Sequence, residues 1–308
     1  MFLLPLLACS FLHANYGAFA QEIPTQKCNG MSALCDRRFD QVVLPTTHNS
    51  TALALGGGPN PVWFIPNQDR TVEEQLNDGI RGFMIDLWPW RGQVYTCHRF
   101  CELGGQPISG VLQTFERFLK NNPNEIVSII FENYVSGAEL DRAFLDAGLL
   151  SYVHTQTQGQ TWPTLKQMID SKKRMVIFKE FEDQGPAWDM LAWNYAVETH
   201  FSYSSIDEFT CEFNRGVKGN SLYILNQFIT VPFFRRSANR SSNTYDRLMN
   251  RAHLCFAEKQ KIPNFLTVDF YTTGDLLKAA KQLNEEFSGN KLSISSLFNA
   301  AVNPMRDR

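Results

Sequence analysis

Several ionisable and amide side chains stand at or just after the ends of apolar segments of this chain. Imidazole and carboxylate groups transfer protons in enzymes, and carboxylate and amide oxygens bind hard divalent cations. A charge that closes an apolar segment costs free energy unless it is paired, hydrated or used. A single such residue would mean little, but their repeated position indicates one shared functional site. They are His48, Asp86, His98, Glu132, Lys179, Asn226 and Asp269.

The segments that carry these residues are short and apolar, which predicts strands. The predicted strands are 41–44, 80–87, 93–97, 126–131, 174–178, 222–229 and 265–270. Amphipathic patterns between them predict helices at 108–120, 165–171, 243–259 and 275–287. Apolar strands that alternate with helices indicate a parallel sheet covered on its outer side.

A single-domain closed β/α barrel accounts for this alternation in a chain of 308 residues. In such a barrel the carboxyl ends of all strands meet on one face, where catalytic groups lie. The polar residues named above would therefore share one pocket. An open doubly wound sheet is the second possibility, and it is disfavoured because Gly56-Gly57-Gly58 lacks the spacing of a dinucleotide-binding turn.

The composition excludes several classes of protein. Lys and Arg number 29 and Asp and Glu number 31, so the net charge of −2 argues against a nucleic-acid partner held by a broad basic field. Hydrophobic residues make up 44% and charged residues 19% of the chain, which argues against disorder. No apolar run reaches the roughly 18 residues that a membrane-spanning helix needs.

The N-terminus is typical of a secretory signal, with an apolar stretch that ends in Ala18-Phe19-Ala20. We expect residues 1–20 to be removed and residues 21–308 to form one extracellular domain. Loss of Cys9 leaves six of the seven cysteines, which suggests three disulfides. A zinc site beside His98 is the alternative, disfavoured because no second Cys/His pair has ligand spacing. Many pairings are formally possible, and the shortest-range set is Cys28–Cys35, Cys97–Cys101 and Cys211–Cys255.

Two N-glycosylation sequons begin at Asn49 and Asn239. We expect Asn239 to lie in an accessible loop. Asn49 directly follows His48, so we expect it to remain unmodified inside the functional site.

Motifs throughout the chain resemble the phosphatidylinositol-specific phospholipase C superfamily, in particular its secreted, single-domain eukaryotic, X-domain-like branch. Each motif alone is modest, whereas their order and spacing are specific. The resemblance implies a distorted TIM-type (β/α)8 barrel of the α/β class and a phosphoric diester hydrolase activity. The matching segments are Thr47-His48-Asn49-Ser50, 75–86, 95–98, 118–127 and 268–271.

The resemblance implies catalytic roles for three residues. His48 would act as the general base that removes the proton from a hydroxyl next to the phosphodiester. His98 would act as the general acid that protonates the leaving alkoxide. Imidazoles suit both tasks because their ordinary pKa lies near 6.5. Asp269 would hold His48 in the correct tautomer.

The resemblance also implies a divalent cation. Asn49, Asp86 and Glu132 match ligand positions of the calcium-dependent branch, and such all-oxygen ligands suit Ca²⁺, with Mg²⁺ as an alternative. Met84 stands where the animal signalling enzymes carry a further glutamate ligand. We therefore expect a weaker Ca²⁺ site than theirs.

Three further residues are candidates for substrate binding. Lys179 matches a lysine that approaches the headgroup phosphates in the family. Asn226 has no role that the resemblance transfers. Arg81 could face phosphate, but its apolar neighbours favour a structural role. Glu180 and Glu182 flank Lys179, and we expect both to be solvated.

Two aromatic segments, 56–66 and 231–240, follow predicted strands and should open on the active-site face. They could make peripheral contact with a membrane, although packing within the protein explains them equally well. No obligate protein partner is expected.

The sequence therefore predicts a secreted phospholipase C-type hydrolase that acts on a phospholipid or an inositol phosphodiester and forms a cyclic phosphate. A glycerophosphodiester phosphodiesterase is an alternative, but its His-Arg-Gly and Glu-x-Asp signatures are replaced here. A catalytically silent lipid-headgroup-binding barrel is favoured by Met84 and opposed by the retained His48 and His98. A glycosidase would leave both histidines unused.

Overall fold

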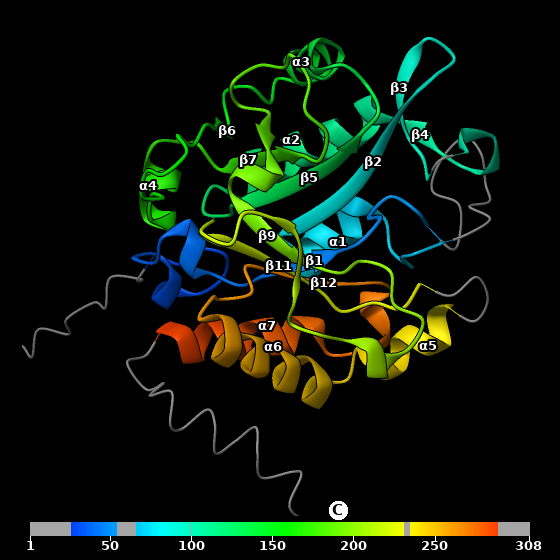
Figure 1. Cartoon of the computed structure of the whole chain (residues 1–308). Coiled ribbons are helices and arrows are strands. Elements are labelled where there is room, and N and C mark those ends of the chain that lie inside the picture. Colours follow the sequence, from blue (N-terminus) through cyan, green and yellow to red (C-terminus); the bar gives the residue numbers. More distant parts are fainter. Residues whose placement is uncertain (1–25, 54–65, 99, 231–234, 289–308) are drawn as a thin grey trace, which may run out of the picture.

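The computed structural model describes residues 26–53, 66–98, 100–230 and 235–288, and Figure 1 shows a curled central sheet with helices on its flanks. The strands are β1 Leu44–Thr47, β2 Gly82–Trp90, β3 Gln93–Thr96, β4 Gln106–Pro107, β5 Val127–Asn133, β6 Val153–His154, β7 Met175–Lys179, β8 Met190–Leu191, β9 Ala196–Thr199, β10 Phe213–Gly216, β11 Leu222–Asn226 and β12 Phe265–Val268. The helices are α1 Val72–Asp78, α2 Ile108–Asn121, α3 Gly137–Asp146, α4 Leu165–Asp170, α5 Arg235–Ser242, α6 Tyr245–Lys259 and α7 Leu276–Ser288.

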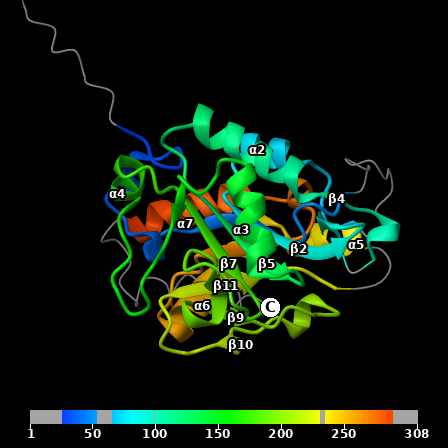
Figure 2. The same cartoon turned by 90° about the horizontal axis from the view of Figure 1, so that it is seen from above.

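The sheet has the order β10-β9-β11-β12-β1-β2-β5-β7-β6. All neighbours from β9 to β6 pair in parallel, whereas β10 is antiparallel to β9. Within the described residues no ladder joins β7 to β9, so the sheet is a curled half-barrel that does not close. The distortion that the resemblance implies is confirmed, whereas the closure expected from the strand pattern is not observed. Figure 2 shows the strands between α2 on one side and α6 on the other.

The period of two along each strand separates an inner core from an outer core. On β2, Met84 packs with the inner cluster, while Ile85 and Leu87 pack with the outer cluster beneath the helices. Phe39 and Trp162 belong to the inner cluster and fill the barrel interior. Residues that follow the inner rows at the carboxyl ends of the strands therefore face a common space.

The predicted strands and helices are present, with shifted ends. Strand β1 starts at Leu44 because residues 39–41 form a short 3-10 helix. The sequence did not predict α1 and α3, which are short but start with capping boxes at Thr71 and Ser136. It also missed β9 and β10. Asn239 lies in helix α5 and is fully buried, so the expectation of an accessible sequon there is wrong.

The three disulfides join the predicted pairs, Cys28–Cys35, Cys97–Cys101 and Cys211–Cys255. This result favours disulfides over the zinc alternative. None of the helices in the described ranges is long and apolar enough to cross a membrane.

Candidate active site

A cavity of about 280 Å³ opens where the carboxyl ends of the parallel strands converge. Four predicted residues line it, namely His48, Asn49, Asp86 and Glu132. The cavity thus brings together residues that the sequence separates by up to 84 positions (132 − 48 = 84).

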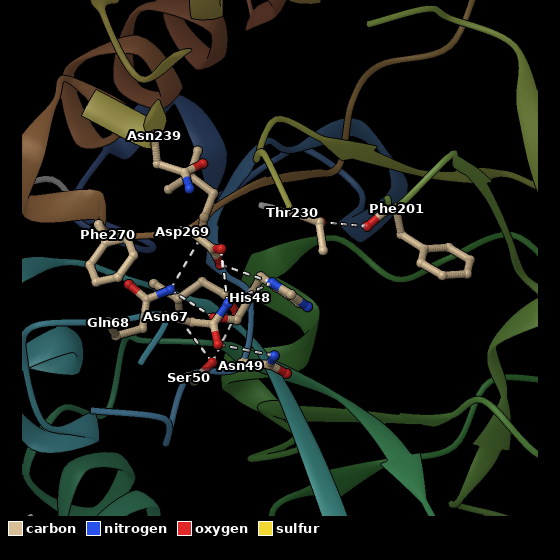
Figure 3. A network of polar contacts seen from close by, with 12 residues as sticks. His48, Asn49, Ser50, Asn67, Gln68, Phe201, Thr230, Asn239, Asp269 and Phe270 are labelled. Atoms are coloured by element: carbon tan, nitrogen blue, oxygen red, sulfur yellow. Dashed lines mark hydrogen bonds and ion pairs between the residues drawn. The ribbon is translucent and has the colours of Figure 1, made fainter. Parts of the chain in front are cut away.

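His48 is held by a buried hydrogen-bond network (Figure 3). Its Nδ1 lies 2.8 Å from Oδ1 of Asp269, which is fully buried. The other oxygen of Asp269 accepts a 2.8 Å hydrogen bond from the Asn67 amide. The imidazole also stacks on Phe228 with 4.0 Å between ring centres. Because Asp269 occupies Nδ1, the Nε2 atom is left for chemistry in the cavity, as the predicted base requires.

His98 lies beside Asn49 but is not itself among the residues that line the cavity. The Nδ2 atom of Asn49 is 3.2 Å from Nδ1 of His98 and 3.3 Å from Oδ1 of Asn67. Asn49 has a φ of 45°, a left-handed conformation that asparagine tolerates better than most residues. Asn49 and Asn67 therefore connect the surroundings of both histidines, as Figure 3 shows for His48.

Asp86 and Glu132 sit side by side on β2 and β5, where they are direct register partners. Burial and the charges of Glu132 and Glu180 raise the pKa of Asp86 well above its usual range. Tyr134 donates a hydrogen bond from its hydroxyl to Glu132. Within the described part of the chain, no side chain or backbone group donates to Asp86. Within the described residues, neither carboxylate of the pair has a cationic partner.

The chemistry of this donor set fits a hard divalent cation, because two carboxylates and the amide of Asn49 line the same cavity. The described residues hold no group of three or more His, Cys, Asp or Glu side chains that could bind a metal. The candidate cation site is therefore limited to Asn49, Asp86 and Glu132, consistent with the apolar Met84 in the cavity wall.

The opposite wall contains an ion-pair cluster that the sequence did not reveal. Arg215 on β10 donates 2.6 Å hydrogen bonds to both Glu180 and Glu198. Its guanidinium lies 4.2 Å from the Trp193 ring centre and 4.4 Å from that of Phe201. Burial raises the pKa of Glu180 to about 7 against the opposing charge of Arg215. The expectation that Glu180 is solvated is therefore wrong.

Lys179 does not line the cavity. It is buried on the outer side of β7, where it forms ion pairs with Asp183 and Asp189. The side chain that turns inward is its neighbour Glu180, because successive residues of a strand face opposite sides. The headgroup contact of Lys179 stays a prediction, and this placement does not favour it. Glu182 is exposed, as expected.

Asn226 lies behind the cavity wall. It is fully buried on β11, and its amide donates a 3.0 Å hydrogen bond to Glu198. It therefore orients a cavity-lining carboxylate and is not among the residues that line the cavity. Direct substrate contact by Asn226 stays a prediction that this placement does not favour.

Arg81 lies just before β2, at the amino end of the strand and away from the cavity. Its Nε is 2.7 Å from Glu125, and its Nη1 donates to the carbonyl oxygens of Leu76 and Ile80. These bonds fix the start of β2 and support the structural interpretation, while substrate binding by Arg81 stays a prediction that its placement does not favour.

We expect Arg81→Met to lower the free energy of unfolding by about 3 kcal/mol, because it leaves the half-buried Glu125 carboxylate unpaired. Urea denaturation measures this loss. The exposed pair Arg142–Asp146 supplies the control, and Arg142→Met should cost about 0.5 kcal/mol or less. A large rise in KM with unchanged stability would instead return Arg81 to the substrate site.

The two aromatic segments predicted to contact a membrane fall mostly on residues 54–65 and 231–234, outside the described residues. Membrane contact therefore stays a prediction.

Comparison with known proteins establishes the class. Residues 34–284 match the PI-PLC X family, and the chain belongs to that family. It is 29% identical over 281 residues to PI-PLC X domain-containing protein 1 of Arthroderma benhamiae, with 83% of this chain and 89% of that protein covered. It is 28% identical over 275 residues to a PI-PLC X domain-containing protein of Arabidopsis thaliana, with 82% of this chain and 62% of the relative covered. The chain thus spans about three fifths of the Arabidopsis protein.

Solved structures support the same fold. The phosphatidylinositol-specific phospholipase C of Listeria monocytogenes superposes with a TM-score of 0.54 at 17% identity, covering 88% of this chain and 97% of that one. A phosphatidylinositol-specific phospholipase C of Staphylococcus aureus gives a TM-score of 0.52 at 13% identity, covering 76% and 87%. At these identities the likeness establishes the barrel and not the reaction.

Proposed function

We propose that this protein is a phospholipase C-type phosphoric diester hydrolase that cleaves a phospholipid or an inositol phosphodiester by acid-base catalysis. The observation that carries the proposal is the hydrogen-bonded group of His48, Asp269 and Asn67, which Asn49 connects to His98 beside one cavity. Membership of the PI-PLC X family supports this class of reaction.

In the proposed reaction, Nε2 of His48 removes the proton from a hydroxyl adjacent to the phosphate. That oxygen then attacks phosphorus, and the bond from phosphorus to the glycerol oxygen breaks. His98 gives a proton to the leaving alkoxide, so the products are an alcohol and a cyclic phosphate. Asp269 stabilises the imidazolium that forms on His48.

Asn49, Asp86 and Glu132 would hold the divalent cation, Ca²⁺ or Mg²⁺. When bound, the cation would lower the pKa of the attacking hydroxyl and offset the negative charge of the phosphate. Without such an ion, the carboxylates of Asp86 and Glu132 would repel an anionic substrate. A cation bound between these carboxylates and the phosphate would remove this repulsion.

The wall of Glu180, Glu198 and Arg215 would receive the headgroup. Carboxylates accept and guanidinium groups donate hydrogen bonds, so the cluster suits the hydroxyls of an uncharged polyol. Additional phosphates on the polyol would meet two carboxylates and one guanidinium. The structure thus favours a headgroup without phosphate monoesters.

We expect kcat/KM for phosphatidylinositol to exceed that for its bisphosphate by about 100-fold, which corresponds to a few kcal/mol of like-charge repulsion. Competition between the two lipids in mixed vesicles measures this ratio. The Glu198→Gln variant should have a smaller ratio of kcat/KM values for the two lipids, because one charge that repels the additional phosphates is lost. Equal cleavage of both lipids by the wild type would contradict the assignment of this wall.

The test of the proposed function is product analysis. Purified protein is incubated with phosphatidylinositol, and the lipid and water-soluble products are separated. We expect diacylglycerol and an inositol phosphate, absent with His48→Ala. Phosphatidic acid as the lipid product would show cleavage on the other side of phosphorus, and tight binding without turnover would support the silent barrel.

An extracellular location is part of the proposal. The chain is 26% identical over 301 residues to a protein of Arthroderma benhamiae named an uncharacterized secreted protein. The present chain has three disulfides, and disulfides form and persist in oxidising compartments. Both observations agree with the N-terminal signal predicted from the sequence.

A further inference from the structure

We propose that the Cys97–Cys101 disulfide is a positioning element for His98, and that its opening disables proton donation to the leaving group while the fold persists. The inference rests on the proposed function and adds a requirement to it. Its basis is the position of the two cysteines around the candidate acid, together with the packing of their sulfur bridge.

His98 lies inside the ring that the disulfide closes. It directly follows Cys97, which itself follows the last residue of β3, and the chain is tied back four residues later with 5.1 Å between the two Cα atoms. The backbone N–H of Phe100 donates a 2.8 Å hydrogen bond to the carbonyl of His98. The segment that carries the imidazole is thus tied to the chain by a covalent bridge and a backbone hydrogen bond.

The disulfide also packs against the segment that carries the other site residues. Cys97 and Cys101 are buried in a small cluster with Ala52 and Leu53. Ala52 in turn donates a 2.8 Å backbone hydrogen bond to the carbonyl of Asn49. The disulfide within the His98 segment therefore packs against the turn that follows His48.

Besides the disulfide, the His98 segment is held by the Asn49 amide, which lies 3.2 Å from Nδ1 of His98, and by the short strand β3. Among the described strands, β3 pairs with β2 and with the two-residue β4, and both β3 and β4 lie off the main path of the sheet (Figure 1). Phe100 and Leu103 are 55% and 47% exposed, so they contribute little burial. The chain returns so close that a Cβ added to Gly105 would lie 2.9 Å from Cβ of Cys97. Packing in this region is therefore centred on the disulfide.

The effect on the reaction follows from geometry. Proton transfer requires a hydrogen bond to the leaving oxygen, and a displacement of about 1 Å can cost about 100-fold in rate. Reduction of the Cys97–Cys101 disulfide would leave the pocket and His48 in place, but His98 would lose its fixed position. The loss of catalytic rate should therefore depend on how much the leaving group needs a proton.

The test uses Cys97→Ser/Cys101→Ser and two substrates that share the inositol phosphate group. One is phosphatidylinositol, whose alkoxide leaving group needs a proton, and the other is a nitrophenyl ester, whose phenolate leaves without one. We expect kcat to fall about 100-fold for the lipid and less than about 3-fold for the nitrophenyl ester. The matched control is Cys28→Ser/Cys35→Ser, which removes a bridge of similar span away from the histidines and should not separate the substrates.

Equal losses on both substrates would show that the bridge supports only the fold, and the inference would be overturned. If the wild type cleaves neither substrate, the proposed function fails and the inference fails with it, which is a different result. Should the double serine variant not fold, mild reduction of the wild type, with the opened bridge identified by mass spectrometry, gives the same comparison. Imidazole NMR of the full chain supplies a readout besides activity, in which the signal of His98 shifts or broadens and that of His48 does not.

Discussion

Replacement of His48 by alanine is expected to lower kcat/KM for phosphatidylinositol by about 10³-fold or more. A positioned base contributes roughly 10² to 10⁴ in rate, and His48 is placed for this role by its 2.8 Å contact with Asp269. The ring is also fixed by stacking on Phe228. Its removal leaves the attacking hydroxyl without an acceptor for its proton.

Asp269→Asn should reproduce much of this loss, because an amide can present the wrong partner to Nδ1 and stabilise the wrong tautomer. His253→Ala is the matched control, since His253 pairs with Glu286 on the helical side of the molecule. Initial-rate kinetics on vesicles compare the three variants. Equal activities of His48→Ala and His253→Ala would remove His48 from the mechanism.

Removal of divalent cations is expected to lower activity about 100-fold, with recovery on addition of Ca²⁺. The cavity contains Asp86, Glu132, Glu180 and Glu198 against the single guanidinium of Arg215. A phosphodiester would enter this field against repulsion unless a cation offsets it, and a bound ion contributes several kcal/mol to such a transition state. Chelation with EDTA followed by Ca²⁺ titration measures the effect.

Asp86→Asn should raise the Ca²⁺ concentration for half-maximal activity by about 10-fold or more, because it removes a charged ligand. The exposed Glu182→Gln is the control that changes charge without touching the cavity. Ca²⁺-dependent stabilisation against heat gives an independent readout of binding. Full activity of the wild type in EDTA would contradict the cation site.

The barrel could be predicted from the sequence because long apolar strands with polar ends leave few other arrangements. Strands β2 and β5 carry Asp86 and Glu132 at matching places, and register alone brings them together. The contact between His48 and Asp269 spans 221 residues but follows from the parallel pairing of β1 with β12. The presence of these strands and the polar residues near their ends could thus be predicted from the pattern, although the exact bounds of the strands could not.

The remaining features of the site depend on details that the pattern does not contain. Lys179 and Glu180 differ by one position, and only the strand register decides which of them turns inward. Glu198 and Arg215 lie on β9 and β10, each of four residues, too short for a clear periodic signal. The long interval between the predicted strands at 174–178 and 222–229 was the one available sign of missing strands. Asn67 contacts His48 from a connecting segment, and no periodicity marks it.

The central claim is that two histidines cleave the diester through attack by a hydroxyl of the substrate itself. A time course of phosphatidylinositol cleavage followed by ³¹P NMR tests it most directly. The account predicts that a cyclic inositol phosphodiester accumulates first, with any monoester appearing later, and that neither forms with His48→Ala. A phosphate monoester released from the start, with no cyclic species at any time, would mean that water attacks phosphorus and would contradict the account.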